Sequence, residues 1–192
     1  GMSVMEELSR ADASTAWTTL NLAGGWINLG SIPRATFDAL YVNGPDVIVG
    51  GVFAPSGTAV PVDGGYRVRG RWAFASGCED CQWLFGNCME ENAEGPRLRT
   101  VLFSPDQIRI EDTWSVSGLC GTGSHHLRAD DVFIRAARTC LPFADPPCLE
   151  YEFISGGELT DWLSKQAVTP EKANQILLSL AQTVGFAHRL NK

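Results

Sequence analysis

The sequence predicts an α+β protein, in which an antiparallel β-barrel or β-sandwich is flanked by short N-terminal helices and a two-helix C-terminal tail. Residues 4–42 have a helical composition, the hydrophobic period changes to two from Asp46 onward, and helical spacing returns after Pro147. Short strands separated by glycine, proline and aspartate are typical of sandwiches and open barrels. The predicted division is a helical segment over 1–44, a β-domain over 45–143 and a helical tail over 144–192.

Composition is that of an ordinary globular protein and argues against several functional classes. Of the 192 residues, 44% are hydrophobic and 19% are charged, which is enough apolar material for a core. A net charge of −7 without any Lys/Arg run argues against nucleic-acid binding. Apolar runs such as Val47–Phe53 are too short to span a bilayer. We expect no membrane partner and, without a signal-peptide pattern, a cytoplasmic protein whose six cysteines are free thiols.

The N-terminal segment carries helix-forming residues together with residues that typically begin or end a helix. Helices are predicted over 6–10 and 13–29, where alanine, leucine and tryptophan recur with few strand markers. Pro33 stands at a suitable first helical position before a third helix over 35–41. Asn43-Gly44-Pro45 then ends the helical segment.

The β-domain is predicted from alternation and turn residues. In the strand over 65–74, Tyr66, Val68, Trp72 and Phe74 fall on one face and arginines fall on the other. Asp63-Gly64-Gly65 predicts a tight turn that joins this strand to a preceding one. The other predicted strands are 59–62, 83–89, 99–103, 108–113, 126–129 and 132–134.

The tail has the pattern of an amphipathic helix. Thr169-Pro170-Glu171 places a capping residue, a proline and an acidic residue where a helix begins. Apolar residues recur at helical spacing from Ala173 to Leu190, and a shorter helix is predicted around 159–164. We expect the last helix to cover apolar surface that would otherwise stay exposed on the β-domain.

Several motifs together resemble one family. Trp72-Ala73-Phe74-Ala75-Ser76-Gly77 is similar to a strand that lies against a flavin ring, and 112–125 (DTWSVSGLCGTGSH) is similar to DTW-x-V-x-GLRGTGSH. Supporting matches are STAW at 14–17, FAPSG at 53–57 and DDVFI at 130–134. The resemblance spans roughly residues 7–142 and is to the middle β-domain of the acyl-CoA dehydrogenase superfamily, closest to its flavin-dependent aromatic and steroid hydroxylase branch.

The resemblance implies a flavin, FMN or FAD, and an aromatic or acyl substrate. Cofactor contacts are expected at Val52, Phe53, Phe74, Ala75 and Ser76. Substrate contacts are expected at Ser56, Thr122 and Ser124. Ala75 stands where the family usually carries Ser or Thr, and Cys120 stands where Arg is usual. No residue of this chain is assigned a catalytic role, because the family carries its base or histidine in a C-terminal four-helix domain.

Two interpretations of function remain open. The first is a truncated flavin-dependent oxidoreductase that hydroxylates aromatic substrates or dehydrogenates acyl thioesters, active only when partner chains, as in a homo-oligomer, complete the site. The alternative is a non-catalytic folded β-domain remnant, or an oligomerising module without flavin. In that interpretation Trp72 and Phe74 are simply a core-facing pair, since aromatic residues at period two usually indicate packing.

Two further groups of residues have simpler interpretations. Cys78-x-x-Cys81 and His125-His126 do not predict a metal site, because adjacent histidines on a strand point to opposite faces. The stretch 146–163 and the helix that ends at 185–188 resemble a protein kinase hinge and its following helix. The nucleotide-binding and catalytic motifs of kinases are missing, which excludes kinase activity, and a helical tail that fills a gap is the simpler interpretation.

Overall fold

The computed structural model describes residues 2–29, 31–43, 46–92 and 95–142. Three helices precede the sheet: α1 (Met2–Ala11), α2 (Ala13–Leu29) and α3 (Arg34–Leu40). They confirm the helices predicted for the N-terminal segment. None of these helices is long and apolar enough to cross a membrane. The tail, with its predicted helices and kinase-like motif, lies outside the described residues.

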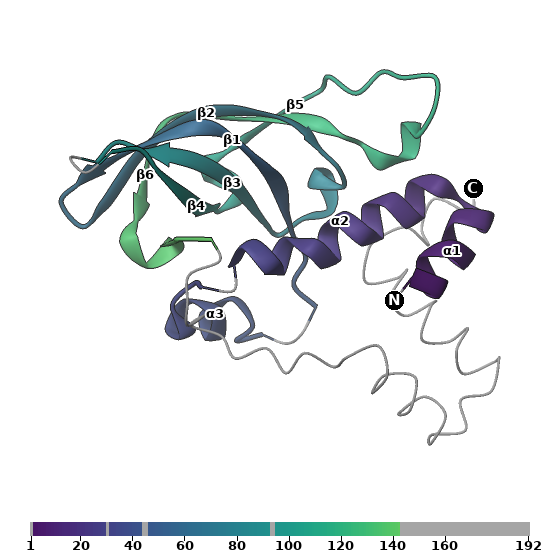
Figure 1. Ribbon diagram of the computed structural model, residues 1–192, viewed down its shortest axis with the longest axis horizontal. Coiled ribbons are helices and arrows are strands. Elements are labelled where there is room, and N and C mark those ends of the chain that lie inside the picture. Colours follow the sequence, from purple (N-terminus) through teal and green to yellow (C-terminus); the bar gives the residue numbers. More distant parts are fainter. Residues whose placement is uncertain (1, 30, 44–45, 93–94, 143–192) are drawn as a thin grey trace.

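Seven strands form one curved sheet above helix α2 (Figure 1). They are β1 (Val49–Val62), β2 (Gly65–Ala75), β3 (Trp83–Glu90), β4 (Arg97–Phe103), β5 (Arg109–Glu111), β6 (His125–Arg135) and β7 (Thr139–Cys140). Their order is β5-β6-β2-β1-β3-β4-β7. The α+β class is confirmed, whereas this open order does not confirm a closed barrel or a two-sheet sandwich.

The sheet is mixed, so the prediction of a wholly antiparallel domain was wrong. β1 and β2 form an antiparallel hairpin across the predicted turn, where Gly64 has a φ of +74°. The chain then crosses through a short 3₁₀ turn, Cys78–Asp80, and returns on the other side of β1. β3 therefore runs parallel to β1, while the other pairings in the sheet are antiparallel.

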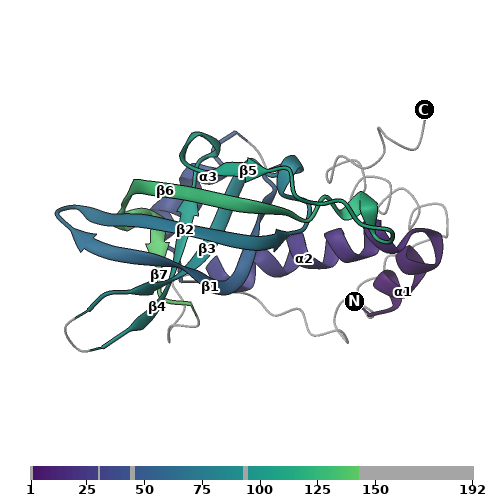
Figure 2. The ribbon, with the colours of Figure 1, turned by 90° about the horizontal axis from the view of Figure 1, so that it is seen from above.

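Helix α2 lies beneath the sheet in both views (Figures 1 and 2). The end of α2 and the residues after it contribute Leu29 and Ile32 to a buried cluster with Val49, Phe85 and Leu102 from three strands. All five side chains are at most 1% exposed. Burying them removes large apolar groups from water and fixes the helix against the sheet.

Strand β6 is continuous where the sequence predicted two strands. Val68 pairs with Val132 and Gly70 pairs with Ala129, so β6 has one extra residue between these pairs. This bulge contains Asp131, whose φ is +56°. Its carboxylate forms an ion pair with Arg67 on the neighbouring strand. The two acidic residues at 130–131 therefore mark an irregularity within one strand and not a break between two.

The Trp72 ring lies in the core and packs against three glycines. Its ring is fully buried, and its indole Nε1 donates to the backbone carbonyl of Asn87 at 2.8 Å. A Cβ atom added to Gly57, Gly70 or Gly86 would lie 2.3, 2.8 or 2.6 Å from the Trp72 ring. The three strands β1, β2 and β3 can approach the indole closely because these positions have no side chain.

Phe74 lies on the opposite face from Trp72, contrary to the sequence prediction. Trp72 pairs with Leu127 and Ala75 pairs with His125, so β2 carries one extra residue between these pairs. Phe74 has a φ of +67° within this bulge, and its side chain is 65% exposed. Ala75 turns back into the core and is fully buried. The bulge shifts the alternation by one residue, which a strict period of two cannot anticipate.

We expect Gly86→Ala to lower the free energy of unfolding by about 1–3 kcal/mol, because its methyl group would overlap the rigid, buried Trp72 ring. Gly118→Ala is the matched control, since no atom lies within 4 Å of a Cβ added there. The control should change stability by less than about 1 kcal/mol. Urea denaturation of both variants measures the difference, and equal stabilities would contradict the proposed packing.

Candidate functional site

Apolar side chains are exposed along helix α2 and the neighbouring strand. Trp17 and Leu20, three residues apart on the helix, are 48% and 50% exposed. Phe53 of β1 is 43% exposed, and its ring lies beside Gly24, one turn further along α2. We call Trp17, Leu20 and Phe53 the apolar surface. Exposed groups of this kind mark sites where a ligand or another chain binds.

Phe74 stands at the edge of a small aromatic cluster. Its ring centroid is 6.1 Å from that of Trp114 and 5.6 Å from that of His126, and both pairs are nearly perpendicular. The left-handed backbone of Phe74 is uncommon for a bulky residue. Such conformations cluster at functional sites, where the surrounding structure holds them in place.

A chain of hydroxyl groups lies behind Phe74 and links three separate segments. Trp17 Nε1 donates to Ser76 Oγ at 3.0 Å. Ser76 Oγ lies 2.8 Å from Ser124 Oγ, which lies 2.7 Å from Thr122 Oγ1. Thr122 Oγ1 in turn donates to the carbonyl of Leu119 at 3.0 Å.

The groups at the two ends of the hydroxyl chain, the Trp17 indole and the Leu119 carbonyl, fix the direction of each hydrogen bond between them. Thr122 has one hydroxyl proton and gives it to the carbonyl of Leu119, so it accepts from Ser124. Ser124 therefore accepts from Ser76, whose oxygen accepts the indole proton of Trp17. All three hydroxyl protons are used inside the protein. The side chain of Ser76 can consequently offer a ligand an acceptor, but no free proton.

The structure brings only some of the predicted site residues together. Ser76, Thr122 and Ser124 meet in the hydroxyl chain and are at most 7% exposed. Phe53 and Phe74 expose their rings, and Ser56 is exposed on β1. Val52 and Ala75 are 8% and 0% exposed. These last two residues can therefore reach a ligand mainly through their backbone.

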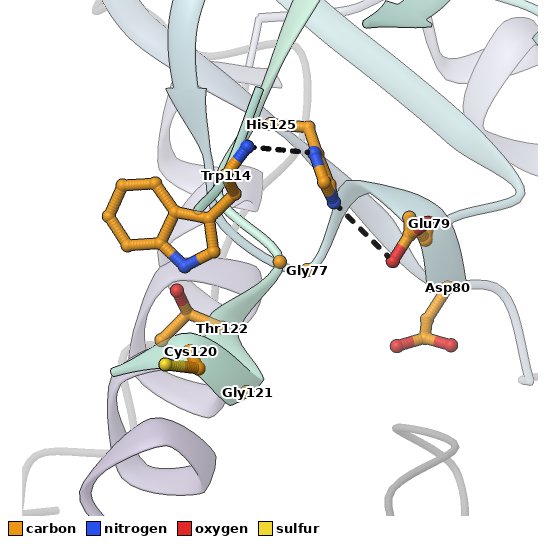
Figure 3. A pocket seen from close by; sticks show the side chains of 9 residues that line it. Gly77, Glu79, Asp80, Trp114, Cys120, Gly121, Thr122 and His125 are labelled. Atoms are coloured by element: carbon orange, nitrogen blue, oxygen red, sulfur yellow. Dashed lines mark hydrogen bonds and ion pairs between the residues drawn. The ribbon is translucent and has the colours of Figure 1, made fainter. Parts of the chain in front are cut away.

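A small polar pocket adjoins the hydroxyl chain. It has a volume of about 100 Å³ and lies between the turn after β2 and the segment that leads into β6 (Figure 3). Its lining consists of Gly77, Glu79, Asp80, Trp114, Cys120, Gly121, Thr122, Gly123 and His125. The backbone N–H of Gly77 donates to the carbonyl of Thr122 at 2.8 Å, which joins the two walls.

His125 is one of the residues that line this pocket. Its Nδ1 accepts the backbone N–H groups of Thr113 at 3.1 Å and Trp114 at 3.3 Å. Its Nε2 faces the carboxylate of Glu79 at 3.8 Å (Figure 3). Only the tautomer with its proton on Nε2 can accept at Nδ1.

Sequence reasoning missed the roles of Trp17 and His125. Trp17 belongs to the STAW motif but was not predicted as a site residue, although a Trp three residues before a Leu on a predicted helix was an available signal. His125 ends the 112–125 motif but was not predicted as a site residue, and as a metal ligand it was rejected. Its two backbone partners lie 11 and 12 residues earlier, a distance at which sequence spacing carries no signal.

Curated relatives of this chain are flavin-dependent oxygenases. The FADH2-dependent resorcinol hydroxylase, oxygenase component, from a Rhizobium species is 43% identical over 142 residues, which is 72% of this chain and 34% of the relative. The indole-3-acetate monooxygenase of Acinetobacter baumannii is 38% identical over 135 residues, 68% of this chain and 34% of the relative. The chain thus spans about a third of the length of the relatives it matches. No family model matches it.

Solved structures similar to this chain include a hydroxylase and a protein in complex with FADH2. The 3-HSA hydroxylase from Rhodococcus sp. RHA1 has a TM-score of 0.67 at 30% identity, over 71% of this chain and 36% of that one. XiaF from a Streptomyces species, solved with FADH2 and glycerol, has a TM-score of 0.67 at 32% identity, over 72% and 36%. The chain is thus similar, over about a third of their length, to flavin-dependent monooxygenases and has the same fold over that part. These matches give no support to the predicted kinase resemblance.

We expect Ser124→Ala to lower the free energy of unfolding by about 1–3 kcal/mol, because it leaves the buried Ser76 and Thr122 hydroxyls each without one partner. Ser117→Ala, at an exposed position of the same segment, is the control and should change stability by less than about 0.5 kcal/mol. Thermal and urea unfolding measure both. Equal stability of the two variants would show that the hydroxyl chain contributes nothing.

Cysteine reactivity should separate buried thiols from the thiol beside the pocket. Burial raises the pKa of Cys78 to about 11 and that of Cys88 to about 12, so at pH 8 both are almost fully protonated and unreactive. Cys120 is exposed. In a Cys148→Ser background, iodoacetamide at pH 8 should label Cys120 first. Cys78 and Cys88 should react only after unfolding or when the pH approaches these values, as peptide mass spectrometry would detect.

Proposed function

We propose that residues 45–143 are the flavin-contacting domain of a flavin-dependent monooxygenase that acts on an aromatic substrate, and that residues 1–44 are part of its N-terminal helical domain. The observation that carries this proposal is the 43% identity over 142 residues to the oxygenase component of an FADH2-dependent resorcinol hydroxylase. The proposed flavin, FAD or FMN, lies against the end of β2 at Phe74, Ala75 and Ser76.

The residues at this edge fit a flavin ring. A flavin needs an apolar wall and a few polar groups near its ring nitrogens and oxygens. The exposed rings of Phe53 and Phe74 offer the wall, and Ser76 offers an oxygen held by the hydroxyl chain. Val52 and Ala75 are buried and would contribute backbone groups. When bound, the reduced flavin supplies the electrons with which oxygen is activated.

The substrate contacts are divided between exposed and buried residues in this proposal. Ser56 is exposed on β1 and can contact the substrate directly. Thr122 and Ser124 are at most 3% exposed and act through Ser76, whose hydroxyl they hold. The names of the relatives, a resorcinol hydroxylase and an indole-3-acetate monooxygenase, support an aromatic substrate class.

We propose that other protein surfaces complete the site. The chain spans about a third of its relatives, and the apolar surface of Trp17, Leu20 and Phe53 is exposed. A homo-oligomer is the arrangement that would cover this surface and enclose the flavin. This assembly and the cytoplasmic location inferred from the sequence stay predictions.

Titration of the purified chain with FAD and FMN, oxidised and reduced, tests the proposal. We expect saturable binding with a Kd below about 1 mM and a raised melting temperature. Phe74→Ala should weaken binding about tenfold or more, because it removes the exposed ring from the proposed wall. Phe133→Ala is the matched control, since Phe133 is 40% exposed near the far end of β6. Absence of binding by wild type, or equal weakening in both variants, would overturn the proposal.

A further inference from the structure

The segment between β5 and β6, residues 112–124, is held at its start by the His125 side chain and by the backbone of the next residue. His125 Nδ1 accepts the N–H groups of Thr113 and Trp114, and the backbone N–H of His126 donates to Thr113 Oγ1 at 3.0 Å. The histidine side chain is only 10% exposed, so water competes poorly for this nitrogen. The contact fixes the backbone immediately before the Trp114 ring, which packs against Phe74.

Acidic groups face both nitrogens of this imidazole. The carboxylate of Glu79 lies 3.8 Å from Nε2, and that of Asp112 lies 3.5 Å from Nδ1. Asp80 and Cys120 line the same pocket, and the thiol of Cys78 donates to the carbonyl of Gly123 beside it. No positively charged side chain is among the residues that line this pocket.

Asp112 provides Nδ1 with an alternative partner. A neutral imidazole with its proton on Nε2 uses the Nδ1 lone pair to accept the two backbone N–H groups. A second proton would occupy that lone pair, so both hydrogen bonds would be lost. The new N–H would instead donate to the carboxylate of Asp112, which is already 3.5 Å away. The two protonation states of His125 therefore favour two different arrangements of the segment's start.

We propose that His125 is a positioning residue that holds Trp114 against Phe74 in its neutral form and releases it when Nδ1 is protonated. Binding by the Phe74 edge is then strong while His125 is neutral and weak once its imidazole carries a second proton. The anchoring of the Thr113 and Trp114 amides follows from the hydrogen bonds of His125 and needs no flavin. Its effect on flavin binding rests on the proposed function.

Hydrogen exchange of the Thr113 and Trp114 amides tests the anchoring without any flavin. His125→Asn places an amide oxygen near the position of Nδ1 and cannot titrate, whereas His125→Leu removes the acceptor. At pH 8 the two amides should exchange about tenfold faster or more in the Leu variant than in wild type, and at nearly the wild-type rate in the Asn variant. His126→Leu, which removes the neighbouring imidazole, should leave both amides protected. Unchanged exchange in the Leu variant would overturn the proposal.

The pH dependence of flavin affinity tests the functional part. Wild type should bind reduced flavin about tenfold or more weakly at pH 5 than at pH 8, because a proton on Nδ1 removes the acceptor of both amides. His125→Asn should bind equally at both values, and this rescue separates positioning from a general loss of stability. A pH profile in the Asn variant that matches wild type would overturn the assignment to His125.

The two proposals can fail separately. If wild type binds no flavin at either pH, the proposed function fails, while the exchange rates still decide whether His125 anchors the segment. If His125→Leu does not fold, the Asn variant decides alone. Exchange rates at pH 5 and pH 8 are first corrected for intrinsic rates. The Thr113 and Trp114 amides should then stay protected at pH 5 in the Asn variant and lose protection in wild type. Equal loss of protection in both proteins would refute the switch.

Discussion

The contact between the Trp72 indole and three glycines is the constraint on which the rest of this structure depends. The ring lies against β1, β2 and β3 at once, and each strand approaches it through a residue without a side chain. Its Nε1 donates to the carbonyl of Asn87, so both the position and the orientation of the ring in the core are fixed. In an interior packed to the density of a crystal, neither the ring nor its glycines can change alone. The contact therefore sets how closely the central strands approach one another.

Trp72 also bears on which side chains the end of β2 exposes. Because Trp72 fills the core, the bulge that follows it turns Phe74 outward and returns Ala75 to the interior. An exposed aromatic ring and a buried anchor thus lie two residues apart on one strand. The proposed flavin edge is consequently attached directly to the packed core, and a preorganised binding site requires such support.

The remaining parts of the site come from segments that are distant in the sequence. Helix α2 supplies the Trp17 indole, and the segment before β6 supplies Ser124 and Thr122. One hydrogen-bonded chain joins them to Ser76, while His125 holds the start of the same segment. A ligand at the edge of β2 would therefore act on three elements together. Loss of one hydroxyl or of the imidazole acceptor affects the position of the others because each donor has a single partner.

The sequence by itself determined the helices, most strand positions, the hairpin at Asp63-Gly64 and the motifs of a flavin-dependent oxygenase, since each of these is encoded in neighbouring residues. Only the tertiary structure decided that Phe74 is exposed, that β1 and β3 are parallel and that β6 is one strand. It also decided the hydrogen-bond partners of Trp17 and His125. These features depend on which strands pair and in what register, and pairing between distant segments is set by packing around Trp72 and by the bulges, which local periodicity does not encode.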